Sequence, residues 1–142
     1  MIRAMRADDL PQVALIERAS FTDPWTEEMF ATGLDLPVAL HYVYEEAGEV
    51  VGYLIGTALF EQAEIANVAT HPSHRKKGLA KALMDVFERE VKTRGAEECF
   101  LEVRVGNLPA LALYHGNGYE KVSVRKKYYP DGEDAFVMKK TL

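Results

Sequence analysis

Hydrophobic and polar positions recur at two different spacings along the chain, and each spacing predicts a kind of element. Apolar residues that recur at steps of three and four lie on one side of a helix, which can then be buried. They predict a first helix with an apolar face of Leu10, Val13, Ile16 and Ala19. Asp8 or Asp9 is placed to cap this helix, and Thr26 to cap a short second one. The N-terminal part of the chain is therefore expected to carry two helices.

Two further helices are predicted downstream. The longer one has an apolar stripe of Leu79, Ala82, Leu83, Val86, Phe87 and Val91. It is expected to end near Arg94, where Gly95 is placed as a left-handed cap. The other starts after Asn107, a good N-cap, has Pro109 in its first turn and runs to about His115.

Segments rich in residues that favour a sheet predict seven strands. Their expected ranges are 2–5, 41–45, 50–60, 64–70, 98–105, 119–125 and 135–139. The order of elements is then βααβββαβαββ. This order predicts an α/β (α+β) fold, with a mixed, mostly antiparallel sheet and helices on both faces. Because no linker or repeat interrupts the pattern, we expect one domain over residues 1–142.

The composition indicates a globular protein that is neither secreted nor membrane-spanning. Hydrophobic residues make up 48% of the chain and charged residues 27%, which is ordinary for a globular domain. The N-terminal segment lacks the apolar stretch of a signal peptide, and no run is long enough to span a membrane. Cys99 is the single cysteine, so we expect a reducing, cytoplasmic compartment and a buried structural thiol rather than a nucleophile.

The charge distribution argues against a nucleic-acid-binding protein, because such proteins usually carry a basic surface. The net charge is −5, and cations gather in two short segments, 75–77 with Lys81, and 125–127. A local cationic spot on an acidic protein suits a small polyanionic ligand better than a long phosphate backbone.

The loop from Arg75 to Ala80 is the strongest local signal. It joins a predicted strand to the long helix, whose N-terminus presents unpaired N–H groups and a partial positive charge. Gly78 would let an anion approach the backbone. The sequence therefore predicts a phosphate site, with a solvated turn as the alternative. Neither a Walker loop nor a dinucleotide-binding fingerprint is present.

Arg75, Gly78 and Ala80 match R/Q-x-x-G-x-G/A, and this loop resembles the pyrophosphate loop of the GNAT superfamily of N-acetyltransferases. Ala80 stands where many members have glycine. Within that superfamily the chain resembles the RimI-type ribosomal-protein-alanine N-acetyltransferases. The matching segments are 23–26, 64–72, 101–104 with Asn107, 112–114 with 118–119, and 125–130 with 133–135. The resemblance covers the whole chain and implies the GNAT fold.

The resemblance also implies an activity and a site. The enzyme would transfer acetyl from acetyl-CoA, without a metal, to the N-terminal alanine of a small-subunit ribosomal protein. The amine would attack directly in a ternary complex, with Glu102 as general base and Tyr114 as general acid. The implied acetyl-CoA-binding residues are Val68, Ala69, Thr70, Lys76, Lys77, Gly78, Leu79, Ala80, Lys81 and Asn107.

Each side chain also has a purely structural alternative. Strand alternation places Glu102 on one face with Phe100 and Arg104, so an ion pair with Arg104 or a neighbouring strand is open. Tyr114 could be a core tyrosine with a bonded hydroxyl. Two loops carry the aromatic residues Trp25, Tyr128 and Tyr129, which suit either a peptide slot or simple packing.

Two other functions stay open on the sequence alone. One is a GNAT acetyltransferase that acts on lysine side chains or a small-molecule amine. The other is an acyl-CoA-binding module without turnover. The sequence assigns no role to His71, His74 or Glu64, and it does not reveal the oligomeric state.

Overall fold

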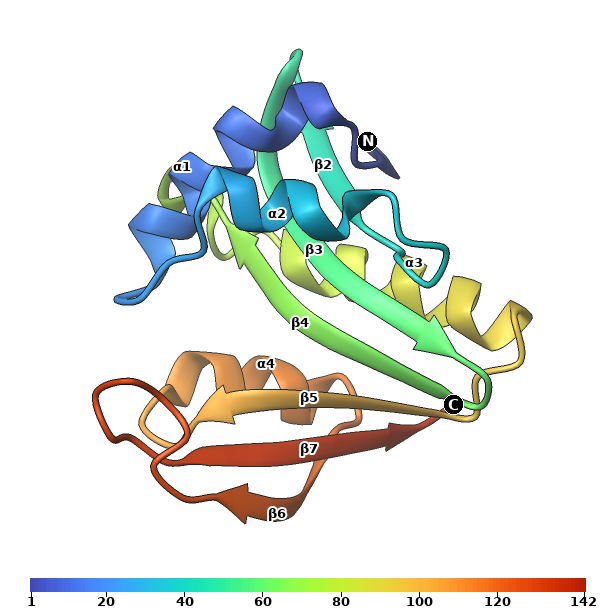
Figure 1. Cartoon of the computed structure of the whole chain (residues 1–142), viewed down its shortest axis with the longest axis vertical. Coiled ribbons are helices and arrows are strands. Elements are labelled where there is room, and N and C mark those ends of the chain that lie inside the picture. The colour runs from blue at the N-terminus through green and yellow to red at the C-terminus, as the bar shows by residue number, and fades with distance from the viewer.

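The computed structural model describes residues 1–142 as one seven-stranded sheet with four α-helices (Figure 1). The helices are α1 (Leu10–Ser20), α2 (Glu27–Leu34), α3 (Leu79–Thr93) and α4 (Leu108–Gly116). The strands are β1 (Ile2–Ala4), β2 (Tyr42–Glu46), β3 (Glu49–Leu59), β4 (Gln62–Thr70), β5 (Glu98–Arg104), β6 (Glu120–Arg125) and β7 (Ala135–Thr141). Short 3-10 helices, η1 (Ala7–Asp9) and η2 (Pro72–His74), lie before α1 and α3. The predicted order of helices and strands is confirmed.

The strand order in the sheet is β1-β2-β3-β4-β5-β7-β6. β4 and β5 are parallel, and every other neighbouring pair is antiparallel. A parallel pair needs a crossover connection, which α3 supplies. β7 lies between β5 and β6, so the last strand enters the sheet inside the one before it. The expected mixed, mostly antiparallel sheet is confirmed.

Helices cover both faces of the sheet, because neighbouring strand residues point to opposite sides. Tyr53 and Ile55 of β3 belong to a cluster of 10 buried residues with side chains from α1 and α2. Leu54 between them belongs to a cluster of 15 buried residues that includes Leu83 and Phe87 of α3. Figure 1 shows α1 and α2 in front of the sheet and α3 behind it.

Local capping explains where three of the helices begin or end. Thr26 Oγ1 accepts a hydrogen bond from the Met29 amide at 3.2 Å, and Asn107 Oδ1 accepts one from the Ala110 amide at 3.2 Å. Gly95 has a φ of 101°, a left-handed conformation typical of the residue after a helix. These predicted caps are confirmed. No helix combines the length and the apolar character needed to cross a membrane.

β4 and β5 stay together over only part of their length. Residues 62–65 pair with 98–101, and Ala66 then forms a β-bulge against β3. Such a bulge bends its strand and increases its twist. Beyond it, residues 67–70 pair with β3 on one side and with no strand on the other. Figure 1 shows β4 and β5 close together near the C-terminus and diverging from there.

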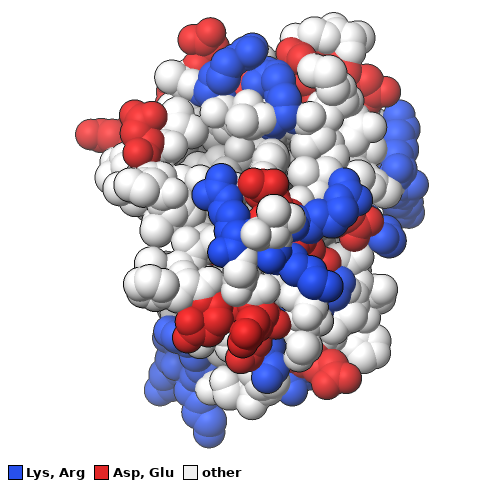
Figure 2. Space-filling model, turned by 90° about the vertical axis from the view of Figure 1, so that its right-hand side faces the viewer, with Lys and Arg blue, Asp and Glu red and all other residues white.

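One face of the molecule can be compared with the surface of a nucleic-acid-binding protein. On the face shown in Figure 2, basic and acidic side chains are interspersed. A nucleic acid would favour a continuous basic surface. This face carries no continuous basic surface of that kind.

Two details predicted for the first helix are wrong. Ala19 is exposed, because the buried stripe of α1 turns away from the sheet after Glu17. Asp9 occupies the N-cap position of α1, but its side chain makes no cap hydrogen bond. Its carboxylate binds a guanidinium instead, in a forked pair whose two parallel bonds join two ionised groups.

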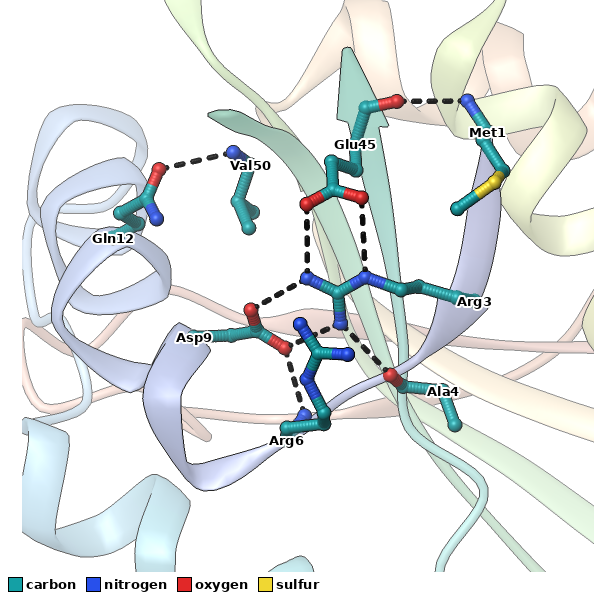
Figure 3. A network of polar contacts seen from close by, with 8 residues as sticks. All are labelled: Met1, Arg3, Ala4, Arg6, Asp9, Gln12, Glu45 and Val50. Carbon is teal, nitrogen blue, oxygen red and sulfur yellow. Dashed lines mark hydrogen bonds and ion pairs between the residues drawn. The ribbon is translucent and has the colours of Figure 1, made fainter. Parts of the chain in front are cut away.

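The partner of Asp9 is Arg3 on β1 (Figure 3). Both carboxylate oxygens of Asp9 accept hydrogen bonds from Arg3 at 2.8 Å, and the Arg6 amide donates to Asp9 at 2.7 Å. Arg3 also lies 3.4 Å from Glu45 on β2. This network joins β1, η1 and β2 at a place that lines none of the cavities described below.

Candidate active site

A cleft opens where β4 and β5 part, and it consists of two adjoining cavities. Both are lined by Asp23, Trp25, Asn67, Glu102 and Tyr129. The first cavity, of about 140 Å³, continues to Val68, Asn107 and Tyr114. The second, of about 500 Å³, continues to Glu64, Tyr128 and Pro130. Residues predicted from distant parts of the sequence thus line one cleft.

Glu102 lies at the junction of the two cavities. Its neighbours on β5, Leu101 and Val103, point into the core on the opposite face, as alternation predicts. The Oε1 atom of Glu102 lies 3.8 Å from Arg125 Nε, and its Oε2 atom is buried and has no hydrogen-bond partner. No ion pair forms with Arg104. A buried carboxylate oxygen without a donor is unfavourable, so this position suits a group that receives a proton.

Tyr114 of α4 lines the first cavity and packs against the larger core cluster. Its neighbour Tyr119, with ring centroids 6.4 Å apart, donates its hydroxyl proton to Glu88 at 2.9 Å. Burial, and then the nearby Tyr129, raise the pKa of Tyr114. The phenol therefore keeps its proton at neutral pH and can donate it.

The loop before α3 has backbone N–H groups that are free to bind a ligand. Lys76 and Gly78 have φ values of 65° and 77°, and left-handed residues of this kind turn successive N–H groups toward one side. No backbone N–H from residue 75 to 81 donates a hydrogen bond, whereas that of Ala82 bonds to the Gly78 carbonyl at 3.0 Å. The side chains of Lys76, Lys77 and Lys81 add positive charge.

Arg75 joins this loop to neighbouring elements through hydrogen bonds. Its Nε donates to the Thr70 carbonyl at 3.3 Å, and its guanidinium lies 3.3 Å from Ser20 Oγ at the end of α1. The loop is thereby tied to the end of β4 and to α1. A phosphate at the N-terminus of α3 would meet a preformed backbone, with little ordering required.

The predicted segment 68–70 lies on the free edge of β4. The side chains of Val68 and Ala69 point into the two core clusters on opposite faces. The His71 amide bonds to the Val51 carbonyl at 2.8 Å, so by antiparallel alternation the backbone of Ala69 bonds to β3 and that of Val68 faces the gap beside β5. Asn107 lines the first cavity, and its Oδ1 is occupied as the cap of α4. Its Nδ2 remains available to a ligand.

Aromatic residues of two loops line the second cavity. Trp25 lies in the loop between α1 and α2, with its ring 5.3 Å from that of Phe30. Tyr128 and Tyr129 lie in the loop between β6 and β7, with their rings 5.1 Å apart and nearly perpendicular. The structure therefore brings the three predicted aromatic residues together.

Glu64 adds a second carboxylate beside Glu102. It pairs in register with Phe100, two residues before Glu102, so the two acids share one face of the sheet. Burial, and then the charge of Glu102, raise the pKa of Glu64, while Arg125 opposes this rise. The second cavity is lined by Asp23, Glu64 and Glu102 and by no lysine or arginine. This lining favours a cationic group such as an ammonium.

The sequence did not reveal Glu17, a buried carboxylate that lines the first cavity. It accepts hydrogen bonds from the Tyr53 hydroxyl, from Asn67 Nδ2 at 3.1 Å and from the Trp25 amide at 3.0 Å. Glu17 thus joins α1, β3, β4 and the Trp25 loop. The sequence offered one signal: Glu17 directly follows Ile16, so it lies beside the apolar stripe of α1.

Arg104 is the second site residue that sequence reasoning left without a role. Its guanidinium binds Asp23 at 2.8 Å, Asp131 at 2.8 Å and Glu133 at 2.9 Å. It also lies over the ring of Tyr129, 4.1 Å from the centroid. Two short loops around the cleft therefore meet at one side chain of β5.

The remaining unassigned residues have structural roles. His71 Nδ1 accepts a hydrogen bond from the Ser73 amide at 3.1 Å and so closes η2, and His74 lies 3.7 Å from Glu46. Cys99 is buried, and burial raises the pKa of its thiol to about 12, as a structural thiol requires. No group of three or more His, Cys, Asp or Glu side chains could hold a metal ion.

Comparison with known proteins places the chain in a family. Residues 10–119 match the model of the acetyltransferase (GNAT) family. A relative from Bacillus subtilis (strain 168) is 38% identical over 139 residues, which cover 96% of this chain and 92% of the relative. The ribosomal protein bS18-alanine N-acetyltransferase of Escherichia coli (strain K12) is 32% identical over 140 residues, 96% of this chain and 94% of that protein.

Solved structures agree with these sequence matches. The crystal structure of the ribosomal-protein-S18-alanine N-acetyltransferase from Escherichia coli superposes with a TM-score of 0.91 at 31% identity, over 99% of this chain and 92% of that one. Ard1 from Thermoplasma volcanium superposes with a TM-score of 0.93 at 28% identity, over 100% of this chain and 97% of that one.

The chain belongs to the acetyltransferase (GNAT) family and has the fold of that family. Its members take the acetyl group from acetyl-CoA, so the class of enzyme and the cosubstrate implied by the sequence resemblance are confirmed. The resemblance to the RimI-type enzymes is confirmed as well, because the bacterial relative that carries this activity in its name matches over nearly the whole chain.

Proposed function

We propose that this acetyltransferase modifies protein N-termini, and that its acceptor is the N-terminal alanine of a small-subunit ribosomal protein. The whole chain, residues 1–142, would form one catalytic domain. One observation carries the proposal: Glu102 and Tyr114 line the same cavity where β4 and β5 part. The names of the relatives support an N-terminal acceptor.

The residues around the cleft fit acetyl-CoA. The unpaired N–H groups of 75–81 and the charges of Lys76, Lys77 and Lys81 suit a diphosphate. From there, the edge of β4 at 68–70, which pairs with no strand on this side, leads back to the cleft, and the backbone of Val68 can bond to an extended amide-containing arm. Asn107 Nδ2 is placed to donate a hydrogen bond in the first cavity.

Acetyl-CoA supplies an acetyl group activated as a thioester. Glu102, directly or through a water molecule, would take a proton from the acceptor amine as it attacks. Backbone N–H groups at 68–70 would stabilise the negative charge that develops on the acetyl carbonyl oxygen, a contribution of about 3–4 kcal/mol. Tyr114 would donate its proton to the departing sulfur. No covalent acyl-enzyme is needed, because the amine attacks directly.

The second cavity fits a peptide N-terminus. The carboxylates of Glu64 and Glu102 attract an ammonium group, and the aromatic rings of Trp25 and Tyr128 can pack against the following residues. An α-amino group has a pKa of about 7.7–8.0, against about 10.4 for lysine. Its deprotonation by Glu102 near neutral pH therefore costs less free energy than deprotonation of a lysine.

Mass spectrometry tests this function directly. The protein is incubated with acetyl-CoA and a peptide that begins with alanine and contains an internal lysine, and fragment ions locate the acetyl group. We expect acetylation of the α-amine alone. The same peptide with a formylated N-terminus is the control, and it should stay unmodified. Acetylation of the lysine, or of free polyamines in preference to the peptide, would contradict the proposal.

The ribosomal origin of the acceptor needs a second measurement. Unacetylated small-subunit ribosomal proteins are offered as a mixture, and intact masses identify those that gain an acetyl group. We expect modification of a protein whose mature N-terminus is alanine. A mixture that gains no acetyl group, while the alanine peptide is acetylated, would refute the ribosomal assignment and leave the N-terminal activity standing.

A further inference from the structure

Arg104 connects the two loops that flank the second cavity. Asp23 belongs to the loop between α1 and α2, whereas Asp131 and Glu133 belong to the loop between β6 and β7. Their carboxylates lie 2.8, 2.8 and 2.9 Å from the guanidinium. The Arg104 side chain is only 18% exposed, so these charge-assisted bonds are partly shielded from water.

No other hydrogen bond links the two loops. The backbone of the β6–β7 loop bonds within the loop, as from the Gly132 amide to the Tyr129 carbonyl at 2.8 Å, and to the end of β5, where the Val105 amide donates to the Asp134 carbonyl at 3.1 Å, but not to the α1–α2 loop. The Thr22 hydroxyl, in the α1–α2 loop, also reaches only Arg104, at 3.5 Å. Arg104, which projects from the inner strand β5, is therefore the one side chain that hydrogen-bonds to both loops.

The same guanidinium orients an aromatic residue of the acceptor cavity. It stacks over Tyr129, 4.1 Å from the ring centroid. Burial raises the pKa of Tyr129 to about 12, so the phenol is neutral beside the cation. Glu133 in addition accepts a hydrogen bond from the Gly106 amide at 2.9 Å, which ties the loop to the turn before α4.

We propose that Arg104 is a positioning residue that holds the two loops in the conformation that receives the acceptor peptide. The inference rests on the proposed function, because it assigns the second cavity to that peptide. Arg104 touches no reacting atom in this scheme. It acts through Asp23, which precedes Trp25 in its loop, and through Tyr129.

Loss of this link has a defined kinetic consequence. Loops that are free to move must be ordered when the peptide binds, which weakens its binding, while the acetyl-CoA site at 75–81 is untouched. The KM for the peptide therefore rises and the KM for acetyl-CoA does not. Arg104→Lys is the sharpest variant, because a lysine keeps the charge but lacks the planar fork that binds several carboxylates.

Arg3→Lys is a matched control (Figure 3). Arg3 also bridges carboxylates from two elements, Asp9 at 2.8 Å and Glu45 at 3.4 Å, and is 14% exposed. It lies outside the cleft. We expect Arg104→Lys to raise the peptide KM at least about tenfold, equivalent to about 1.4 kcal/mol, with the acetyl-CoA KM unchanged. Arg3→Lys should leave both KM values unchanged. Equal changes in both KM values, or equal effects of the two variants, would overturn the proposal.

Trp25 provides a readout that needs no acceptor, because it is the single tryptophan of the chain. Acrylamide should quench its fluorescence faster in Arg104→Lys than in the parent protein and in Arg3→Lys. Identical quenching in all three would refute the role of Arg104 in holding the loop. A parent protein that fails to acetylate alanine peptides would instead refute the proposed function, whatever the quenching shows.

Discussion

The Oε1 atom of Glu102 lies 3.8 Å from the Nε atom of Arg125, and the Oε2 atom of the same carboxylate is buried without a hydrogen-bond partner. This contact is longer than a charge-assisted hydrogen bond, so Arg125 does not lock the carboxylate into a forked pair. Glu102 keeps the capacity to accept a proton in the cleft. The first prediction follows from this relationship.

Glu102→Gln should lower kcat by about 10²- to 10⁴-fold, because an amide cannot accept the amine proton. Binding of acetyl-CoA, measured by calorimetry, should be retained. Glu98→Gln is the control, since Glu98 lies on the same face of β5 and pairs with Lys139 at 3.3 Å, away from the cleft. A normal kcat in Glu102→Gln would show that another group removes the proton.

Tyr114→Phe should also lower kcat while the KM for acetyl-CoA stays the same, because the ring remains and only the proton donor is lost. Tyr119→Phe is the matched control. It removes a hydroxyl bonded to Glu88, which should cost about 1 kcal/mol of unfolding free energy with little effect on kcat. Equal kcat losses in the two variants would mean that Tyr114 has a packing role only.

The pH dependence of kcat gives a separate test of Tyr114. Because burial raises its pKa above the usual 10.0, the protonated, donating form persists to higher pH. The parent enzyme should therefore show no loss of kcat from tyrosine ionisation up to about pH 10. A decline centred near pH 8 that disappears in Tyr114→Phe would contradict this assignment.

Reversal of charge at Lys76 and Lys77 should raise the KM for acetyl-CoA by about tenfold or more, because each substitution replaces attraction to phosphate with repulsion. The KM for the peptide should not change, and the effect should weaken at high salt. Lys92→Glu, in the last turn of α3, is the control for net charge. Unchanged affinity for acetyl-CoA would place the diphosphate elsewhere.

Glu17→Gln should destabilise the fold by about 2–3 kcal/mol, because an amide NH₂ would face donors that now bond to a buried carboxylate. Those donors are the hydroxyl of Tyr53, the side-chain amide of Asn67 and the backbone amide of Trp25. Urea unfolding measures the loss. Glu28→Gln, at an exposed position of α2, should change stability by less than about 0.5 kcal/mol.

Asp9 should make the free energy of unfolding depend on pH in the acidic range. Its bonds to Arg3 lower the pKa of its carboxyl despite the opposing effect of burial. The charged pair therefore contributes stability above the unfolded pKa of about 3.9, and this contribution is lost as the pH falls through the lower folded value. In urea unfolding, the stability difference between the parent protein and Asp9→Asn should shrink below about pH 4. A difference that stays constant to pH 2 would refute the linkage.

Local signals explain why the elements were predictable. The caps Thr26 and Asn107 bond to amides three residues away, and Gly95 adopts the left-handed conformation within one turn of α3. Strand alternation placed Glu102 on its face of β5 for the same reason, since it depends on immediate neighbours. Ala19 was misplaced because helical periodicity does not reveal where the sheet beneath a helix ends.

The contacts of Arg104 and Glu17 had no local signal. Arg104 binds Asp23 across 81 residues and Asp131 across 27, and Glu17 binds Asn67 across 50. Spacing rules operate within a few turns of helix or along one strand. They cannot show that the segments 23–26, 101–104 and 133–135, which carry the resemblance to the RimI-type enzymes, meet around one guanidinium.

The amino-acid sequence by itself determined the helices, the strands and the family, because each depends on neighbouring residues or on short motifs. Only the tertiary structure decided that β4 and β5 part beyond the bulge at Ala66, that β7 lies between β5 and β6, and that Glu102 and Tyr114 share a cavity. Those arrangements depend on packing between segments far apart in the chain, where many small contact energies together select one arrangement.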